Sequence, residues 1–292
     1  MKHTYTITLL LFSLFITAHL IGLGVINSYL NVTPEGVEWK SLPSIAGVEV
    51  ERPDVAPQYS IWYILFAVLF GTVLILFIIK FKTMMLWKIW FTLAVTLCLF
   101  IAFAAFVRPS FAFSLALVLG LIKVFKPNIY VHNLTEIFVY GGLAAIFVPI
   151  LDVMYAFILL LLLSVYDMYA VWKSKHMVSM AKFQTKSGIF AGLLIPYTKT
   201  GTQVKTTSKT AAKQTAKSAK TAVLGGGDVG FPLIFSGTVL AAFGFLNALI
   251  VSLFAGLALV CLLLLSQKDK IYPAMPFLTA GCVAGFLITL LI

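Results

Sequence analysis

Long apolar runs alternate with short polar connections along the whole chain, a pattern typical of proteins with many membrane-spanning helices. A helix needs about twenty apolar residues to cross a bilayer, and windows of that kind occur about nine times. They lie at residues 5–27, 59–79, 87–107, 110–125, 134–151, 152–172, 222–243, 245–266 and 272–292. The pattern predicts an all-α polytopic membrane protein with about nine transmembrane helices.

Two longer polar stretches interrupt these spans. Residues 28–58 are rich in proline and hold half of the acidic residues, which predicts an irregular exterior loop with short strands. Residues 173–221 form a second loop, in which the apolar run 189–195 predicts a strand or a membrane-skimming segment. The chain thus divides into spans one to six in 1–172, the loop 173–221, and spans seven to nine in 222–292.

The end of the second loop repeats lysine at every fourth position, at Lys205, Lys209, Lys213 and Lys217. Like charges at this spacing oppose an isolated helix in water, so we expect the loop to be partly disordered. The alternative is a lysine stripe that lies on anionic lipid headgroups.

Composition supports the membrane class and orients the chain. The sequence is 61% hydrophobic and 11% charged, with a mean hydropathy of +1.04, far from the balance of a soluble domain. The net charge is +11, and 18 of the 21 basic residues lie in loops on the side of the N-terminus. The positive-inside rule therefore predicts a cytoplasmic N-terminus and an external C-terminus. The excess of basic residues is explained by the loops on the cytoplasmic side of the membrane, so we expect no nucleic-acid partner.

Two acidic residues fall inside predicted spans. Asp167 lies about five residues before the cytoplasmic end of the sixth span, and Asp228 about six residues after the start of the seventh. At 1.5 Å per residue, both are roughly 8–9 Å inside their helix ends. The two spans run in opposite directions, so the carboxyl groups are expected to face each other. A charge in lipid is costly, which makes both acids candidates for function.

Two neighbouring carboxyl groups in a low dielectric share one proton. The ionised group can take a proton from water as the water attacks a carbonyl carbon, while the protonated group hydrogen-bonds the carbonyl oxygen. This chemistry hydrolyses peptide bonds. An ion or proton pathway that uses the same acids stays open as an alternative, as does a non-catalytic scaffold.

Three segments surround the two acids in this hypothesis. Tyr166 precedes Asp167 and can donate a hydrogen bond near it. Three residues without Cβ atoms precede Asp228 and let backbone or water approach it: Gly225, Gly226 and Gly227. Before the last span, two prolines three residues apart predict an extended segment that includes Pro273, Ala274 and Met275. The four histidines show no metal-ligand spacing and no phosphate-binding loop is present, so no cofactor is expected.

These segments together resemble those of presenilins and signal peptide peptidases, the GxGD intramembrane aspartyl proteases. The resemblance rests on Tyr166-Asp167, on Gly225-Gly226-Gly227-Asp228 and on Pro273-Ala274-Met275, each on the expected span. Met275 stands where the family usually has Leu, a change of similar volume. The predicted orientation is that of presenilins, and the compact chain is typical of a microbial, archaeal homologue in the cell membrane.

The resemblance implies that Asp167 and Asp228 form the catalytic pair, and that the flanking residues support the site and the substrate. It also implies that the substrates are transmembrane segments of single-span proteins. Presenilins act with partner subunits and are cut within the loop between the sixth and seventh spans. Accessory subunits, a homo-oligomer and such a cut all remain open for this chain.

A substrate helix hides its peptide bonds in its own hydrogen bonds and must unwind before cleavage. An exposed strand edge can capture the freed backbone by adding it as another strand. The candidate edges are residues 189–195, the segment Ala222-Val223-Leu224 and the segment at Pro273.

Overall fold

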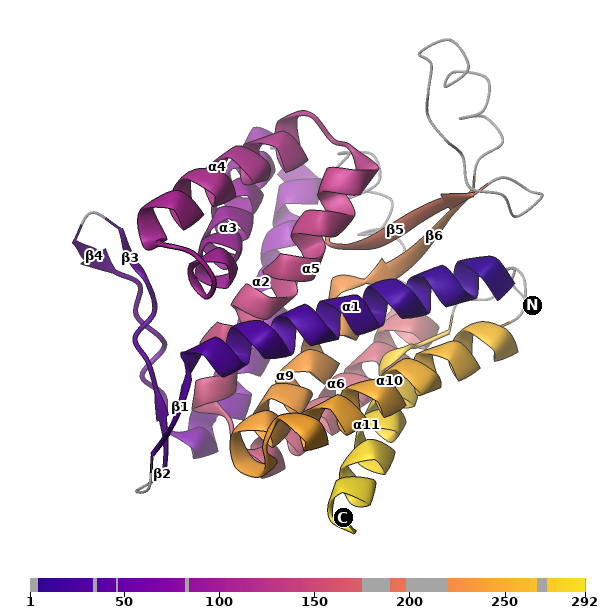
Figure 1. Ribbon diagram of the computed structural model, residues 1–292. Helices are drawn as coiled ribbons and strands as arrows, with labels where there is room; N and C mark the ends of the chain where they lie inside the picture. The colour runs from indigo at the N-terminus through magenta and orange to yellow at the C-terminus, as the bar shows by residue number, and fades with distance from the viewer. Residues whose placement is uncertain are drawn as a thin grey trace.

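The computed structural model describes residues 5–33, 36–45, 47–81, 84–174, 190–197, 220–266 and 272–291. The helices in these ranges are α1 (Tyr5–Tyr29), α2 (Pro57–Phe81), α3 (Met84–Ala104), α4 (Pro109–Phe125), α5 (Ile129–Phe147), α6 (Val153–Tyr169), α9 (Gly226–Phe243), α10 (Phe245–Leu265) and α11 (Met275–Thr289) (Figure 1). A 3₁₀ turn (Val148–Ile150) follows α5, and a π turn (Ala170–Ser174) follows α6. Seven of these α-helices are long and apolar enough to span a membrane, and α4 and α11 are shorter apolar helices. The predicted helical membrane fold is confirmed, while the orientation of the termini stays a prediction.

One predicted helix boundary is wrong. The seventh span was expected from residue 222, but Lys220–Gly225 form strand β6, and α9 begins only at Gly226. The partner of β6 is the antiparallel strand β5 (Gly192–Tyr197), which confirms the strand expected near 189–195. Pairing between these two segments, which are distant in sequence, overrides the apolar pattern that reads as one continuous helix. The lysine tract between the strands lies outside the described residues.

The loop at residues 28–58 contains the predicted short strands. β1 (Leu30–Thr33) pairs with β2 (Gly36–Trp39), and β3 (Ser44–Ile45) pairs with β4 (Val48–Glu49). Both hairpins extend from one side of the helices (Figure 1). Arg52 ties this loop to the bundle, because its guanidinium donates to the carbonyls of Ala145 at 3.1 Å and Lys40 at 2.6 Å.

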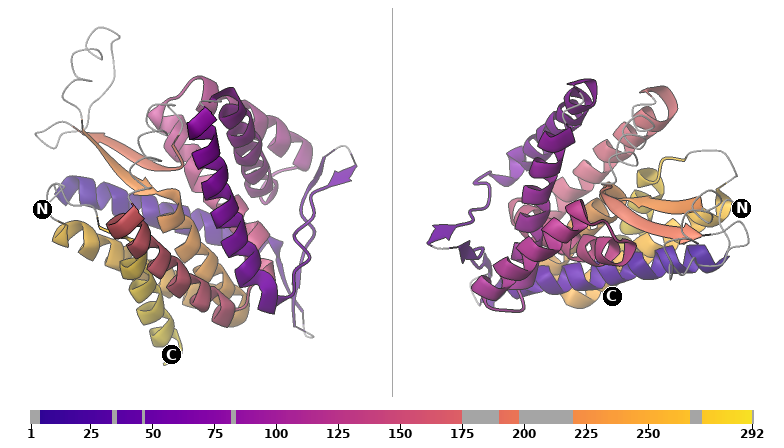
Figure 2. Two further views of the ribbon diagram at one scale, coloured as in Figure 1. Left: turned by 180° about the vertical axis from the view of Figure 1, so that it is seen from behind. Right: turned by 90° about the horizontal axis from the view of Figure 1, so that it is seen from above.

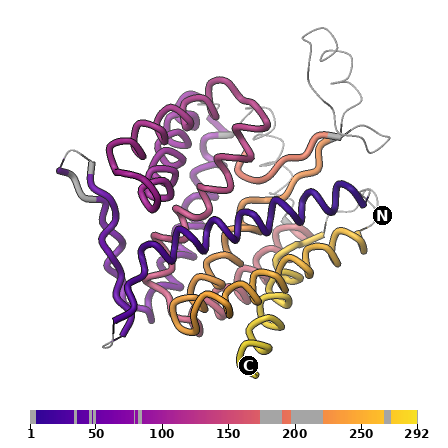
Figure 3. The backbone as a smooth tube through the Cα atoms, in the orientation of Figure 1, coloured from indigo at the N-terminus to yellow at the C-terminus, as the bar shows by residue number. Residues whose placement is uncertain are grey.

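Helix α9 is the centre of the bundle. It packs against α1, α5, α6, α10 and α11, and every residue from Pro232 to Leu240 is buried. Apart from Asp228, Ser236 and Thr238 the helix is apolar on all sides, as expected for a helix enclosed by others. Figure 3 follows the chain from β6 directly into this central helix.

Helix α2 contrasts with α9, because it lies at the outside of the bundle and most of its surface is exposed (Figure 2). Its main packing partners among the helices are α3 and α6. Its apolar surface is therefore available to lipid.

Glycines allow the closest helix contacts, as is common in membrane bundles. Gly281 and Gly285 of α11 lie directly on the backbone of α10. Gly142 of α5 lies so close to α3 that a Cβ atom there would overlap the Cys98 carbonyl.

We expect Gly142→Ala to destabilise the fold, because α3 and α5 would have to separate to admit the methyl group. Overpacking of this kind lowers the melting temperature by about 3–10 °C. Gly71→Ala in α2 is the matched control, because a Cβ atom added there would meet nothing within 4 Å. Thermal unfolding in detergent measures both, and an unchanged melting temperature for Gly142→Ala would contradict the close contact.

Candidate active site

Asp228 lies in the first turn of α9, three residues after the N-cap residue Gly225. Its carboxyl group folds back and accepts a hydrogen bond from the Gly225 backbone N–H. This is the return half of a capping box, which supplies an acceptor to a backbone donor that the helix leaves unpaired. The positive end of the helix dipole also favours a negative charge at this position.

Gly225 leaves the space that the Asp228 carboxyl group occupies. A Cβ atom at residue 225 would lie 2.9 Å from Oδ2 of Asp228. Its neighbour Gly226 donates its N–H to the Ala191 carbonyl at 3.1 Å, which joins the helix start to the segment before β5. Gly227 is exposed, and a Cβ atom there would meet only the ring of Phe231. The three glycines therefore have three different surroundings.

Asp167 lies in the last turn of α6 and is buried. Its Oδ2 atom accepts a hydrogen bond from the backbone N–H of Met275 at 3.1 Å. Met275 is the first residue of α11, so its N–H has no partner inside that helix. Asp167 therefore caps a helix that lies more than a hundred residues away in the sequence.

The two carboxyl groups belong to helices that pack against each other, α6 and α9. They lie close enough for the charge of Asp167 to act on Asp228. Each group also accepts a hydrogen bond from the backbone at the start of a helix. Two acids in this arrangement can hold one proton between them, which is the requirement for acid and base catalysis by a carboxyl pair.

A second contact fixes α6 against α11. Ser164, one turn before Asp167, forms a hydrogen bond of 2.8 Å with Thr279. Both hydroxyl groups are buried. Sequence reasoning missed this pair, although Ser164 lies three residues before Asp167 and therefore on the same helix face.

Comparisons with known proteins identify the family of this chain. The sequence model of one family, described as signal-peptide peptidase, presenilin aspartyl protease, matches residues 43–292. The chain belongs to this family. The protein is thus a multi-pass integral membrane protein and an intramembrane aspartic endopeptidase.

Solved structures show the same fold. A presenilin family intramembrane aspartate protease, solved in space group C222, matches with a TM-score of 0.62 and 17% sequence identity. That match covers 97% of this chain and 98% of the other. A structure with the same description in space group P2 matches with a TM-score of 0.57 and 16% identity, over 96% of each chain. A comparison with curated proteins found no match.

The segment at Pro273 differs from its prediction in one respect. An extended backbone was expected through Met275, but α11 already begins at that residue. Pro276 occupies the first turn of the helix, where its missing N–H costs no hydrogen bond. The Met275 side chain is buried and packs in the main core, beside Ala274.

The Tyr166 side chain is not tied to the site by a hydrogen bond among the residues that the structure describes. Its side chain is 36% exposed, and its hydroxyl makes no hydrogen bond within those residues. A role for Tyr166 therefore stays a prediction.

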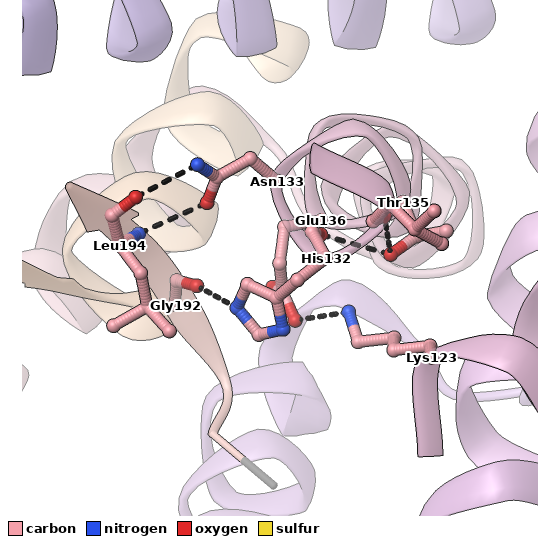
Figure 4. A network of polar contacts seen from close by, with 8 residues as sticks. Lys123, His132, Asn133, Thr135, Glu136, Gly192 and Leu194 are labelled. Carbon is pink, nitrogen blue, oxygen red and sulfur yellow. Dashed lines mark hydrogen bonds and ion pairs between the residues drawn. The ribbon is translucent and has the colours of Figure 1, made fainter. Parts of the chain in front are cut away.

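Sequence reasoning also missed a polar network on α5. Lys123 and Glu136 form a buried ion pair, and His132 and Asn133 bind the backbone of β5 (Figure 4). A signal existed, because His132, Glu136 and Tyr140 follow one another at steps of four in an apolar helix. That spacing places three polar side chains on one helix face.

We expect Gly225→Ala to lower peptidase activity, because the new methyl group displaces the carboxyl group of Asp228. A shift of about 1 Å at a reacting group costs roughly 10- to 100-fold in kcat/KM. Gly230→Ala, one turn further along α9, is the control, since its Cβ atom would lie 3.8 Å from Leu143. Cleavage of a single-span peptide measures both variants, and full activity of Gly225→Ala would contradict the proposed contact.

Proposed function

We propose that the protein hydrolyses peptide bonds within the transmembrane segments of single-span membrane proteins, with Asp167 and Asp228 as the catalytic pair. One observation carries this proposal. The two carboxyl groups lie on helices that pack against each other, α6 and α9, and each accepts a hydrogen bond from a backbone N–H at the start of a helix. Membership of an aspartyl protease family supports the same chemistry.

The reaction uses the pair as one acid–base unit. The ionised carboxyl group takes a proton from a water molecule, whose oxygen attacks the carbonyl carbon of the scissile bond. The protonated carboxyl group donates a hydrogen bond to the carbonyl oxygen as the carbon becomes tetrahedral. A proton then passes to the leaving nitrogen and the C–N bond breaks. Because the two groups titrate together, the pair rather than either residue holds the shared proton.

Asp167→Asn and Asp228→Asn are each expected to abolish cleavage, with a loss of at least about 100-fold in kcat. Asp152→Asn is the matched control. Asp152 caps α6 by accepting from the Tyr155 N–H at 2.8 Å, and asparagine caps equally well. Mass spectrometry of a single-span peptide in liposomes detects the products.

The same liposomes test the ion-pathway alternative. Ion or proton flux without peptide cleavage would favour that alternative and overturn the proposed hydrolysis. Cleavage that survives both Asp→Asn changes would show that other residues do the chemistry.

The substrate reaches the pair, in this proposal, by adding a strand to the outer edge of β6. Leu194 lies opposite Val223, and both Leu194 backbone groups point away from β6, toward Asn133. In an antiparallel ladder the opposite residue then also points its N–H and C=O outward. Val223 is 49% exposed, and no other described residue bonds its outward backbone groups, so in this proposal the edge accepts a further strand. The edge leads through Leu224 to Gly225, beside Asp228.

We therefore expect Val223→Pro to reduce cleavage about tenfold or more, because proline removes the outward N–H that a substrate strand would use. The hairpin itself should persist, since this N–H is not used by β5. Val223→Ala keeps the N–H and serves as the control. Normal turnover of a well-folded Val223→Pro variant would count against capture at this edge.

A further inference from the structure

The hairpin of β5 and β6 has two edges, and side chains of α5 cover one of them. The carboxamide of Asn133 binds both backbone groups of Leu194: Nδ2 donates to the carbonyl at 2.8 Å, and Oδ1 accepts from the N–H at 3.0 Å. A neighbouring strand would offer the same donor and acceptor. Asn133 therefore takes the place of one strand residue, as Figure 4 shows.

His132 binds the same edge of β5 two residues earlier, at Gly192. Its Nε2 atom lies 2.7 Å from the carbonyl oxygen of Gly192. A carbonyl oxygen can only accept, so Nε2 carries the proton and donates. Gly192 and Leu194 are the alternate positions whose backbone groups face α5, and α5 binds a carbonyl at each of them.

The helix that carries these two side chains is itself fixed in place. Glu136 lies one turn after His132 and pairs with Lys123 of α4. Both side chains of this pair are buried, with 3% or less of their surface exposed. Removing one partner of such a pair leaves an unpaired buried charge, so the contact holds α4 and α5 in one arrangement.

The two edges of the hairpin therefore differ. An open strand edge binds any extended chain that meets it, and a two-stranded hairpin is marginal by itself. Covering β5 removes one docking edge and supports the hairpin at the same time. The remaining edge, β6, is the one that continues into Gly225 and α9.

We propose that Asn133 is a positioning residue for peptide hydrolysis. Asn133 binds the outward N–H and carbonyl of Leu194, so no further strand can pair with β5 there. The same bonds fix the position of the hairpin, and an extended substrate segment therefore pairs with β6, the strand that leads to Asp228. This inference rests on the function proposed above. It assigns to α5 a part in substrate placement without any contact to the reacting atoms.

The test uses Asn133→Asp in the full-length protein. The substitution keeps the size and the acceptor for the Leu194 N–H, but it loses the donor and sets two oxygens against each other. We expect KM for a single-span peptide to rise at least about fivefold while kcat changes less than about twofold, since one hydrogen bond of the docking platform is lost. Hydrogen exchange of residues 192–197 and 220–225 should become faster.

Asn247→Asp is the matched control. Asn247, in the first turn of α10, donates to the backbone carbonyl of Phe243, the last residue of α9, at 2.6 Å. The same chemical change there should leave KM and the hairpin exchange at their original values. If Asn133→Asp cannot be purified, Asn133→Ser shortens the side chain without adding a charge and carries the same expectation.

Two results would overturn the inference. Unchanged KM and unchanged hydrogen exchange in a folded Asn133 variant would show that this contact does not determine the position of the hairpin. A lower kcat at constant KM would indicate only a smaller active fraction. Failure of the proposed function is separate, because it appears as cleavage by Asp167→Asn or Asp228→Asn in the same assay.

Discussion

Carboxyl groups inside an apolar helix bundle need hydrogen-bond donors, and here the backbone at two helix beginnings supplies them. Met275 at the start of α11 donates to Asp167, and Gly225 at the start of α9 donates to Asp228. A helix start is suited to this task because its first N–H groups lack partners and its dipole is positive there. The surrounding sequence follows from the same need: glycine leaves room for the carboxyl group, and Pro276 fits the first turn of α11.

The placement of these helix starts depends on the packing of α9. Because this helix is enclosed by five others, its first turn is held from several sides while β6 continues it out of the bundle. The hairpin is the only part of the described chain that connects an exposed strand edge directly to Asp228. Its other edge is paired with α5 through Asn133 and His132. Substrate placement and catalysis, as proposed, therefore share one continuous stretch of backbone.

Several features could be predicted from residue patterns alone. Apolar runs near the length of a bilayer identified the helices. The equal depth of Asp167 and Asp228 predicts that their carboxyl groups face each other, and this stays a prediction. The short apolar run at 189–195 predicted either a strand or a membrane-skimming segment, and the structure has the strand β5 there. The start of α9 could not be placed, because Ala222, Val223 and Leu224 are apolar in a strand and in a helix alike. Only the pairing with β5 distinguishes the two states.

The sequence by itself determined the membrane class and the succession of apolar helices, because both follow from hydropathy. It also identified Asp167 and Asp228 as candidate functional residues, because a charge in lipid is costly. The tertiary structure decided which donors serve each acid and which hairpin edge is open. Those choices depend on contacts between distant segments, such as Asp167 with Met275 and Asn133 with Leu194. Such contacts cannot be predicted from local composition, because a backbone donor can pair with any acceptor that the fold brings close to it.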